Sequence, residues 1–189
     1  KKRAKMLGEV DNLREQIRNI NILFVIDATS SMEHYFGSAA EAVTESMKDL
    51  KVKLANSDYI ESLNFSAAVY RDVDDGEKIF DDYHGFTSKS QDIINYLESV
   101  ECKSEGDSPE AVFQGLIKSL KKFKGKKDQK NIIIWIGDAG NRRENVASNI
   151  SEIRKLSMDY NVNWSIFQIR SDQEYDFYTD FKTDANQII

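Results

Sequence analysis

The sequence has few of the residues that cross-link a chain or bind soft metals. Cys102 is the single cysteine among 189 residues, so the chain can form neither an internal disulfide nor a thiolate metal cluster. We expect Cys102 to act as a small buried hydrophobic residue. Histidine is also scarce, with only His34 and His84 present.

Long apolar segments and excess positive charge are absent as well. No apolar run approaches the roughly 18 residues that suggest a membrane span, so we expect no direct membrane insertion. The formal net charge of −6 argues against nucleic acid as the partner, because phosphate binding needs a basic surface. The lysine-rich stretch 121–130 is a local exception, which we interpret as a solvated helix end and loop rather than a docking patch.

Several signature motifs of nucleotide-binding proteins and hydrolases are missing. The sequence contains no G-x-x-x-x-G-K-[ST], G-x-G-x-x-G or G-x-S-x-G motif, and therefore offers neither a phosphate cradle nor a nucleophile elbow. It also has no internal repeat and no Pro/Gly-rich linker. We expect a single domain over residues 20–189, preceded at 1–19 by an amphipathic helix or a linker to an upstream region.

Apolar residues recur in a pattern that alternates between strands and helices. Ile22–Ile26 and 131–136 are continuous apolar runs, typical of strands buried on both faces of a parallel sheet. Strands are also predicted at 63–70, at about 78–80 after an acidic turn, and at 162–169. Spacings of three or four residues predict helices at 32–54, 88–100, 108–123, 146–156 and, more weakly, 173–186. A capping box of Ser88 and Gln91, and Ser108 followed by Pro109, mark two of the helix starts.

This order of elements predicts the fold class. Strands that alternate with helices form an α/β, doubly wound, mostly parallel central sheet with helices on both faces, here with one short antiparallel edge strand. Ligands of such sheets bind at the carboxyl ends of the strands, near the switch in strand order. Functional residues are therefore expected in the loops after Ile26, Tyr70 and Ile136.

Oxygen-bearing side chains occupy these loops. Asp27, Thr29 and Ser31 fall on alternate residues directly after the first buried strand, where they can converge on a hard divalent cation. The alternative is that they only end the strand and cap the following helix. Glu110 and Asp138 bring two further acidic loops, the second directly after another buried strand.

Three segments resemble the metal-binding loops of von Willebrand factor type A (VWA) domains. They read F-V-I-D-A-T-S-S-M, G-D-S-P-E-A-V and I-I-I-W-I-G-D-A-G, and the similarity spans roughly residues 20–170. The D-x-P-E form of the second segment resembles integrin β subunits and a bacterial branch, where glutamate replaces the commoner threonine. The resemblance implies a Rossmann-like sheet and a metal-ion-dependent adhesion site.

The resemblance also implies roles for these residues. Thr29 and Ser31 would bind the metal through their hydroxyls, Glu110 directly or through water, and Asp27 and Asp138 directly or through waters while holding the hydroxyls. The implied ion is Mg²⁺, with Mn²⁺ or Ca²⁺ as alternatives. One open coordination position would take a carboxylate from a protein partner, an interaction that needs no catalysis.

A second cation is a further possibility that the resemblance raises. Asp72, within Tyr70-Arg71-Asp72, and Asp107 would form this auxiliary metal site. The alternatives are an acidic hairpin turn around Asp72, a helix cap at Asp107, or an ion pair of Arg71 with one of these acids.

Two other function classes compete with a metal-dependent interaction module. A strand-end aspartate followed by hydroxyls also occurs in phosphohydrolases of the haloacid dehalogenase type, but Thr29 stands where these carry a second aspartate, which removes the usual acid/base partner. The other alternative is a metal-independent scaffold domain in a multiprotein assembly. The sequence starts at Lys1 without a signal peptide, and we expect it to belong to a larger bacterial protein of the envelope or a secretion system.

Overall fold

Five strands form one sheet in the part of the chain that the computed structural model describes, which is residues 8, 10–11, 14–72, 79–103, 110–169 and 176–189. The strands are β1 (Asn19–Asp27), β2 (Ser62–Tyr70), β3 (Phe80–Asp82), β4 (Lys130–Gly137) and β5 (Val162–Gln168). The helices are a 3-10 turn η1 (Ser30–Met32), α2 (Glu33–Leu54), α3 (Ser90–Ser99), α4 (Val112–Lys121), α5 (Val146–Asp159) and α6 (Asp176–Ile188).

The strand order is β3-β2-β1-β4-β5, with β1 in the centre. β1 pairs in parallel with β2 and β4, β4 pairs in parallel with β5, and β3 is the antiparallel edge strand beside β2. The predicted fold class is therefore confirmed. The short edge strand lies two residues further along the chain than the sequence indicated.

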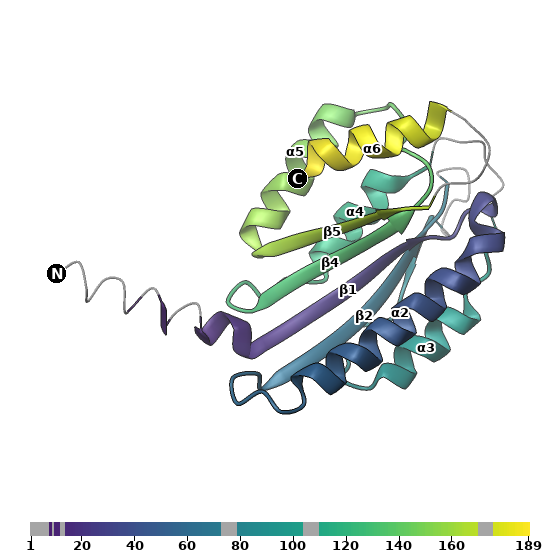
Figure 1. Cartoon of the computed structure of the whole chain (residues 1–189). Helices are drawn as coiled ribbons and strands as arrows, with labels where there is room; N and C mark the ends of the chain where they lie inside the picture. Colours follow the sequence, from purple (N-terminus) through teal and green to yellow (C-terminus); the bar gives the residue numbers. More distant parts are fainter. Residues whose placement is uncertain (1–7, 9, 12–13, 73–78, 104–109, 170–175) are drawn as a thin grey trace.

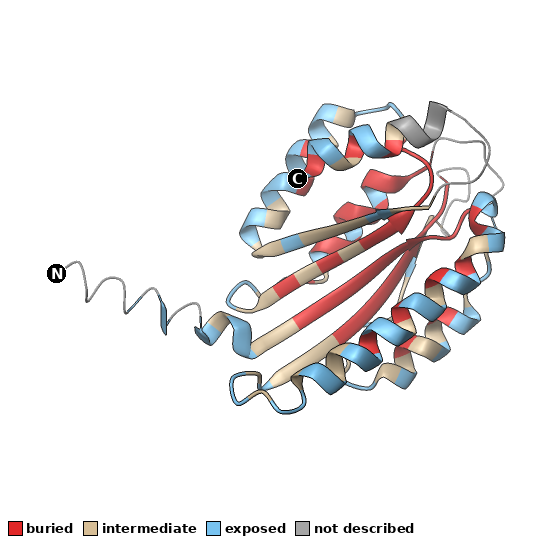
Figure 2. Cartoon of the chain, in the orientation of Figure 1, coloured by how far each residue is buried: buried red, intermediate tan, exposed pale blue. Residues whose placement is uncertain are grey.

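The sheet is covered by helices on both faces (Figure 1). α2 and α3 pack on one face, where the core includes Phe24, Ile26 and Phe65. α4, α5 and α6 cover the other face around Val25 and Trp135. The central strands are therefore buried along most of their length, as Figure 2 shows. Residues 22–26 therefore lie between two apolar layers, which explains their continuous apolar run.

β1 is the strand at which the strand order changes direction. β2 lies on one side of β1 and β4 on the other, so the order of strands reverses at β1. The carboxyl ends of β1, β2 and β4 therefore meet at the place where doubly wound sheets bind ligands. The registers Asp27↔Tyr70 and Ile26↔Ile136 align these three ends across the sheet.

The capping box predicted for one helix start is contradicted by the structure. α3 begins at Ser90, and its N-cap residue Lys89 makes no side-chain cap hydrogen bond, so the capping box of Ser88 and Gln91 was wrong. Instead, the Lys89 backbone N–H donates to Thr87 Oγ1 at 3.0 Å, a local turn that competes with the predicted cap. The cap residues predicted for the following helix, Ser108 and Pro109, lie outside the described residues.

The segment before β1 is helical wherever the structure describes it, at residues 8, 10–11 and 14–18. Val10 and Ile17, two apolar residues of its predicted stripe, are 43% and 42% exposed. Arg18 fixes the end of this segment to the domain, because its carbonyl accepts the Glu61 N–H at 2.8 Å. The boundary at residue 20 stays a prediction. No helix within the described ranges is both long and apolar enough to cross a membrane.

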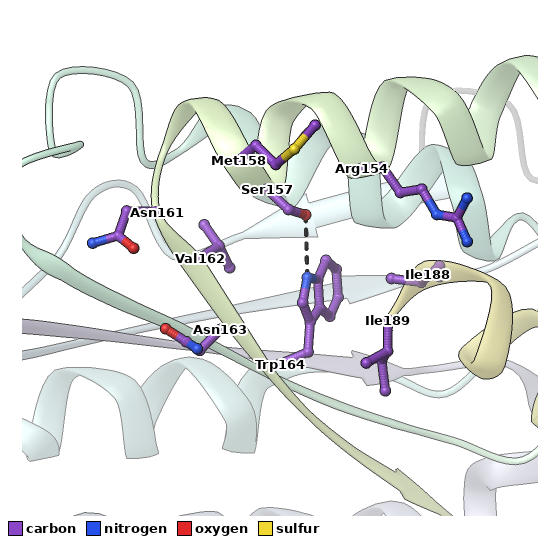
Figure 3. Close-up of a pocket in the computed structure, with 9 residues that line it drawn as sticks. All are labelled: Arg154, Ser157, Met158, Asn161, Val162, Asn163, Trp164, Ile188 and Ile189. Carbon is purple, nitrogen blue, oxygen red and sulfur yellow. Dashed lines mark hydrogen bonds between the residues drawn. The ribbon is translucent and has the colours of Figure 1, made fainter.

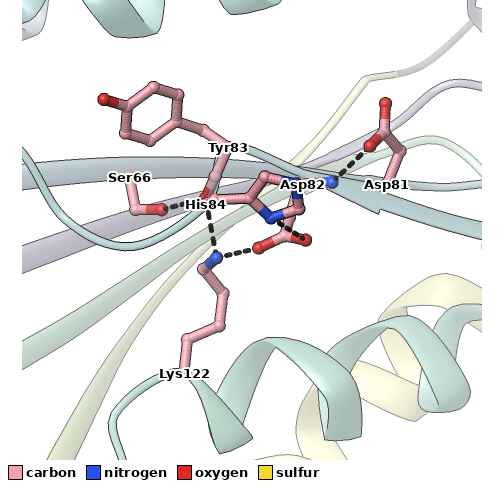
Figure 4. Close-up of polar contacts among 6 residues, drawn as sticks. All are labelled: Ser66, Asp81, Asp82, Tyr83, His84 and Lys122. Carbon is pink, nitrogen blue, oxygen red and sulfur yellow. Dashed lines mark hydrogen bonds and ion pairs between the residues drawn. The ribbon is translucent and has the colours of Figure 1, made fainter.

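The edge of the sheet at β3 carries a polar cluster (Figure 4). Lys122 donates to the Asp82 carboxylate, and also to the Tyr83 carbonyl at 2.8 Å. His84 Nδ1 lies 3.9 Å from Asp82 Oδ1, and its side chain is almost fully exposed. Lys121 forms an ion pair with Glu152 at 3.0 Å. These two lysines of the basic stretch therefore have acidic neighbours within the domain.

At the amino-terminal end of the sheet, amide side chains of β2, β1 and β4 contact one another from strand to strand. Asn21 Nδ2 donates to Asn131 Oδ1 at 2.9 Å and to Gln129 Oε1 at 2.7 Å, and Asn64 Nδ2 approaches Asn21 Oδ1 at 3.4 Å. Asn21 and Asn131 are fully buried. Because the register aligns Asn21 with both Asn64 and Asn131, each amide meets its neighbour directly across the ladder.

A pocket of about 660 Å³ opens between α5, the start of β5 and the end of α6 (Figure 3). The Trp164 indole donates to Ser157 Oγ at 3.1 Å, and Ile189 forms part of the wall. A second pocket of about 470 Å³ lies between α2 and the β4–β5 part of the sheet. Neither pocket is lined by a predicted metal ligand.

Candidate metal centre

The loop after β1 is organised by the Asp27 carboxylate. Asp27 Oδ1 accepts hydrogen bonds from the Thr29 backbone N–H at 2.9 Å and from the Thr29 hydroxyl at 2.6 Å. The Thr29 and Ser31 hydroxyl oxygens lie 3.2 Å apart. The three side chains that were predicted to act together therefore face one another in the structure.

The alternative, that Asp27, Thr29 and Ser31 only end the strand and cap the following helix, is supported in part. Thr29 is the N-cap residue of η1, but its side chain makes no cap hydrogen bond, and neither does that of Met32 before α2. The Thr29 hydroxyl donates to Asp27 instead. Local hydrogen bonding thus ends the strand, while the two hydroxyls stay beside a carboxylate, as a cation site requires.

Asp138, directly after β4, joins this group from the neighbouring strand. The Ser31 hydroxyl forms a hydrogen bond with its carboxylate, and the charge of Asp138 acts on Asp27. Both carboxylates are almost completely buried, whereas Ser31 is exposed. The site is therefore buried on its Asp27 and Asp138 side and reaches solvent at Ser31.

Glu110 is held next to the Asp138 loop by backbone pairing. It forms an isolated parallel bridge with Asn141, in which the Glu110 N–H donates to the Gly140 carbonyl at 3.0 Å and the Arg142 N–H donates to the Glu110 carbonyl at 2.9 Å. Asn141 Oδ1 in turn accepts the Phe113 N–H at 2.7 Å, at the start of α4. Glu110 is 3% exposed, and its charge acts on Tyr70 together with those of Asp27 and Asp138.

Burial raises the pKa values of two of these carboxyls. The pKa of Asp27 rises to about 7, first because burial disfavours the charged form and then because Asp138 is near. Burial also raises the pKa of Asp138, against the stabilising hydrogen bond from Ser31. Two buried carboxylates in contact favour a bound proton or a bound cation over two free negative charges.

The donors present fit a hard divalent cation. Asp27 Oδ2 and Asp138 Oδ1 are buried and have no hydrogen-bond partner among the described residues, although buried polar atoms are almost always paired. Carboxylate and hydroxyl oxygens suit Mg²⁺, Mn²⁺ or Ca²⁺ and do not suit metals that prefer sulfur. Counting only His, Cys, Asp and Glu, the described chain holds no group of three placed to bind a metal. Asp27, Glu110 and Asp138 alone are therefore not such a group, and the candidate site also depends on the Thr29 and Ser31 hydroxyls.

Comparison with known proteins identifies the family. Residues 6–189 match the family described as the TssR protein VWA domain. The chain belongs to this VWA family. A curated relative, the ariadne-like RING finger protein R811 of Acanthamoeba polyphaga mimivirus, is 26% identical over 150 residues, which are 77% of this chain and 14% of that protein.

Solved structures share the VWA fold at low sequence identity. The pilus adhesin SpaC of Lactobacillus rhamnosus GG, in its open conformation, matches with a TM-score of 0.64 at 12% identity, over 91% of this chain and 27% of that one. BatB of Bacteroides thetaiotaomicron matches with a TM-score of 0.62 at 12% identity, over 89% and 84% of the two chains. The chain thus spans only a small part of the curated relative and of the adhesin.

Asp72, one of the two residues suggested for an auxiliary cation, faces a basic side chain in this VWA domain. Asp72 is fully buried and forms an ion pair with Arg142 at 3.0 Å, so a positive charge already faces it. Asp107 lies outside the described residues. The Arg71 guanidinium donates to the Glu101 carbonyl at 2.9 Å. The sequence did not indicate Arg142, because it is distant in the chain from Asp72.

Other residues around the VWA site were also missed by the sequence interpretation. Asn141 joins the Glu110 loop to α4, and its N–H donates to Asp184 Oδ2 of α6 at 2.7 Å. Arg143 then pairs with both Asp180 and Asp184 of α6 at 2.8 Å. Asn141 directly follows the G-D-A-G segment and Arg143 lies two residues further on, and this proximity to Asp138 was the available signal.

Proposed function

We propose that this VWA domain is a non-catalytic protein-protein interaction module that binds a divalent cation through Asp27, Thr29, Ser31, Glu110 and Asp138. The observation that carries the proposal is the pair of buried carboxylates, Asp27 and Asp138, each with one oxygen that has no partner among the described residues. A cation would neutralise both charges and use both oxygens, whereas a structural role leaves this cost without compensation.

The bound cation would keep an open position for a carboxylate of a partner protein. Ser31, at the solvent-exposed margin of the site, marks the direction from which such a side chain can approach. Three carboxylates around a dication leave a net charge of about −1, so Mn²⁺ or Ca²⁺ can serve beside Mg²⁺. The adhesin role named for SpaC supports a function in protein contacts, and we propose a bacterial envelope or secretion-system assembly as the setting.

The first experiment compares melting temperatures in EDTA and in millimolar Mg²⁺, Mn²⁺ or Ca²⁺. An ion that binds only the native state at about 100 times its Kd stabilises it by about 2.7 kcal/mol. We expect a metal-dependent rise that Asp27→Ala abolishes and that the exposed loop variant Asp128→Ala retains. If no ion raises the melting temperature, the domain is a metal-independent scaffold instead.

A second experiment tests the partner chemistry. A peptide with a central aspartate should bind the metal-loaded domain, and its asparagine counterpart should not, since only a carboxylate can complete the coordination shell as an anion. EDTA should abolish the difference between the peptides. Hydrolysis of p-nitrophenyl phosphate in Mg²⁺ that is lost in Asp27→Ala would favour the phosphohydrolase alternative over a non-catalytic module.

A further inference from the structure

Tyr70 is a buried tyrosine at the floor of the candidate metal centre. It ends β2, is aligned with Asp27 in the parallel register, and is fully buried in the core between the sheet and α4. Side chains alternate along a strand, and Asp27 follows Leu23 and Val25 on this same face of β1. The phenol of Tyr70 and the carboxylate of Asp27 therefore belong to one layer.

Two glycines leave room for this tyrosine. A Cβ atom at Gly115 of α4 would lie 2.6 Å from Tyr70 Cβ, and a Cβ atom at Gly137 of β4 would lie 2.5 Å from Tyr70 Oη. The same Cβ at Gly137 would lie 3.4 Å from Asp27 Cβ. Any side chain at position 137 would thus displace the hydroxyl from the space beside Asp27.

The hydrogen bonding of Trp135 leaves the Tyr70 proton available. The Trp135 indole is a donor only, and it donates to Tyr70 Oη at 3.0 Å in a fully buried contact. The phenol oxygen is the acceptor in this bond, so its own O–H can serve a second acceptor. Of the charged groups that act on Tyr70, Asp27 acts most strongly, ahead of Asp138 and Glu110.

We propose that Tyr70 is a positioning residue, which directs its hydroxyl toward the Asp27 carboxylate from beneath and donates a hydrogen bond to it in the metal-loaded domain, so that the orientation in which Asp27 faces the cation is fixed. Trp135 holds the phenol in place, and Gly137 supplies the space. The inference rests on the metal-binding function proposed above. Groups that orient a metal ligand commonly change metal affinity by about 10- to 100-fold when they are removed.

The test measures Mn²⁺ binding by titration calorimetry on the folded domain at one pH. Tyr70→Phe removes only the hydroxyl, and we expect the Kd for Mn²⁺ to rise by about tenfold or more. Tyr96→Phe is the matched control, because the Tyr96 hydroxyl is also buried but lies in α3, on the other face of the sheet. Its Kd should equal that of the wild type.

Two further variants separate positioning from stability. Trp135→Phe keeps the Tyr70 hydroxyl but removes its anchor, so Mn²⁺ affinity should fall by less than in Tyr70→Phe. The double variant Tyr70→Phe/Trp135→Phe removes both ends of the hydrogen bond, and its Mn²⁺ affinity should be no higher than that of Tyr70→Phe, while the smaller ring at position 135 leaves a cavity that lowers the melting temperature in EDTA.

The outcomes distinguish this inference from the function on which it rests. Wild-type binding with an unchanged Kd in Tyr70→Phe would overturn the role of Tyr70 and leave the metal site standing. Recovery of affinity in the double variant would show that the loss in Tyr70→Phe came from the unpaired Trp135 indole and not from the missing hydroxyl beside Asp27, which also overturns it. An absence of Mn²⁺ binding in the wild type would remove both proposals together.

Discussion

The two ends of the central strands bury polar side chains in opposite ways. At the amino-terminal end, Asn21 and Asn131 of β1 and β4 are fully buried and bind each other through their amides. At the carboxyl end, Asp27 ends β1 and Asp138 directly follows β4. Both are almost completely buried, and each keeps an oxygen without a hydrogen-bond partner among the described residues. One pair of strands thus carries both arrangements.

The difference follows from the chemistry of the two side chains. An amide both donates and accepts, so a row of amides satisfies itself and contributes to fixing the strand register. An ionised carboxylate only accepts, and two in contact also repel. The amino-terminal end is therefore complete within the chain, whereas the carboxyl end needs a proton or a cation from outside.

The largest expected effect comes from removing one charge at the carboxyl end. Asp138→Asn keeps the size of the side chain but removes a ligand charge, so we expect most of the Mg²⁺-dependent stabilisation, about 2.7 kcal/mol at 100 times the wild-type Kd, to disappear. Melting curves of Asp138→Asn in EDTA should show no loss of stability, because the substitution removes a buried charge that lies beside the Asp27 carboxylate. Asp159→Asn, at an exposed position of α5, is the control. An equal Mg²⁺-dependent stabilisation in both variants would contradict the proposed difference between the two ends of the strands.

The pH dependence in EDTA should come next. The pKa of Asp27 is raised from 3.8 to about 7 in the folded state, so the folded domain holds a proton that the unfolded chain releases. This contribution to stability is complete below about pH 4 and is lost as the pH rises through about 7, with a slope of at most about 1.4 kcal/mol per pH unit.

Denaturant titrations from pH 5 to 8 measure this slope, and Asp27→Asn should flatten it. Metal binding should respond in the opposite direction, because the cation replaces the proton and binds more tightly at higher pH. Wild-type stability in EDTA that is flat or rising between pH 5 and 7 would argue against a shared buried charge at this end.

A change at the amino-terminal end should act on stability alone. Asn131→Ala removes the donor to the carbonyls of Lys126 and Tyr160, at 2.8 and 2.7 Å, and leaves both acceptors inside the domain. We expect a loss of about 2 kcal/mol in urea unfolding, with the metal-induced shift unchanged. Asn56→Ala, in an exposed turn, should cost almost nothing. A smaller metal-induced rise in melting temperature in Asn131→Ala would contradict this prediction, because it would show that the two ends of the central strands are coupled.

The smallest effect on stability is expected at the solvent-exposed margin of the metal centre. Ser31 is exposed, so Ser31→Ala should change stability in EDTA by no more than about 0.5 kcal/mol. Its hydroxyl is a proposed ligand, and the Kd for Mn²⁺ should nevertheless rise. Ser38→Ala, at an exposed position of α2, is the control. Equal Mn²⁺ affinity in the two variants would restrict the site to its carboxylates and Thr29.

The fold class and the position of the candidate site at one edge of the sheet could be predicted from the sequence alone. The apolar runs of β1 and β4 mark strands buried on both faces, and the three-to-four residue spacing of α2 marks a helix, because each pattern is a local consequence of burial. The acidic loops after Ile26 and Ile136 then had to meet, since parallel strands end at one edge. The family resemblance rested on these same loops.

The contacts between side chains around the candidate site follow from tertiary packing and could not be predicted. The pairing of Asp72 with Arg142, the bond from Trp135 to Tyr70, and the bridge of Glu110 with Asn141 join residues from separate elements. The predicted cap at Ser88 failed for a related reason, since Thr87 pairs with Phe65 of β2 and its hydroxyl accepts the Lys89 N–H. Sequence periodicity reports which face of an element is buried, whereas these contacts depend on how the elements pack together, and no local pattern encodes that.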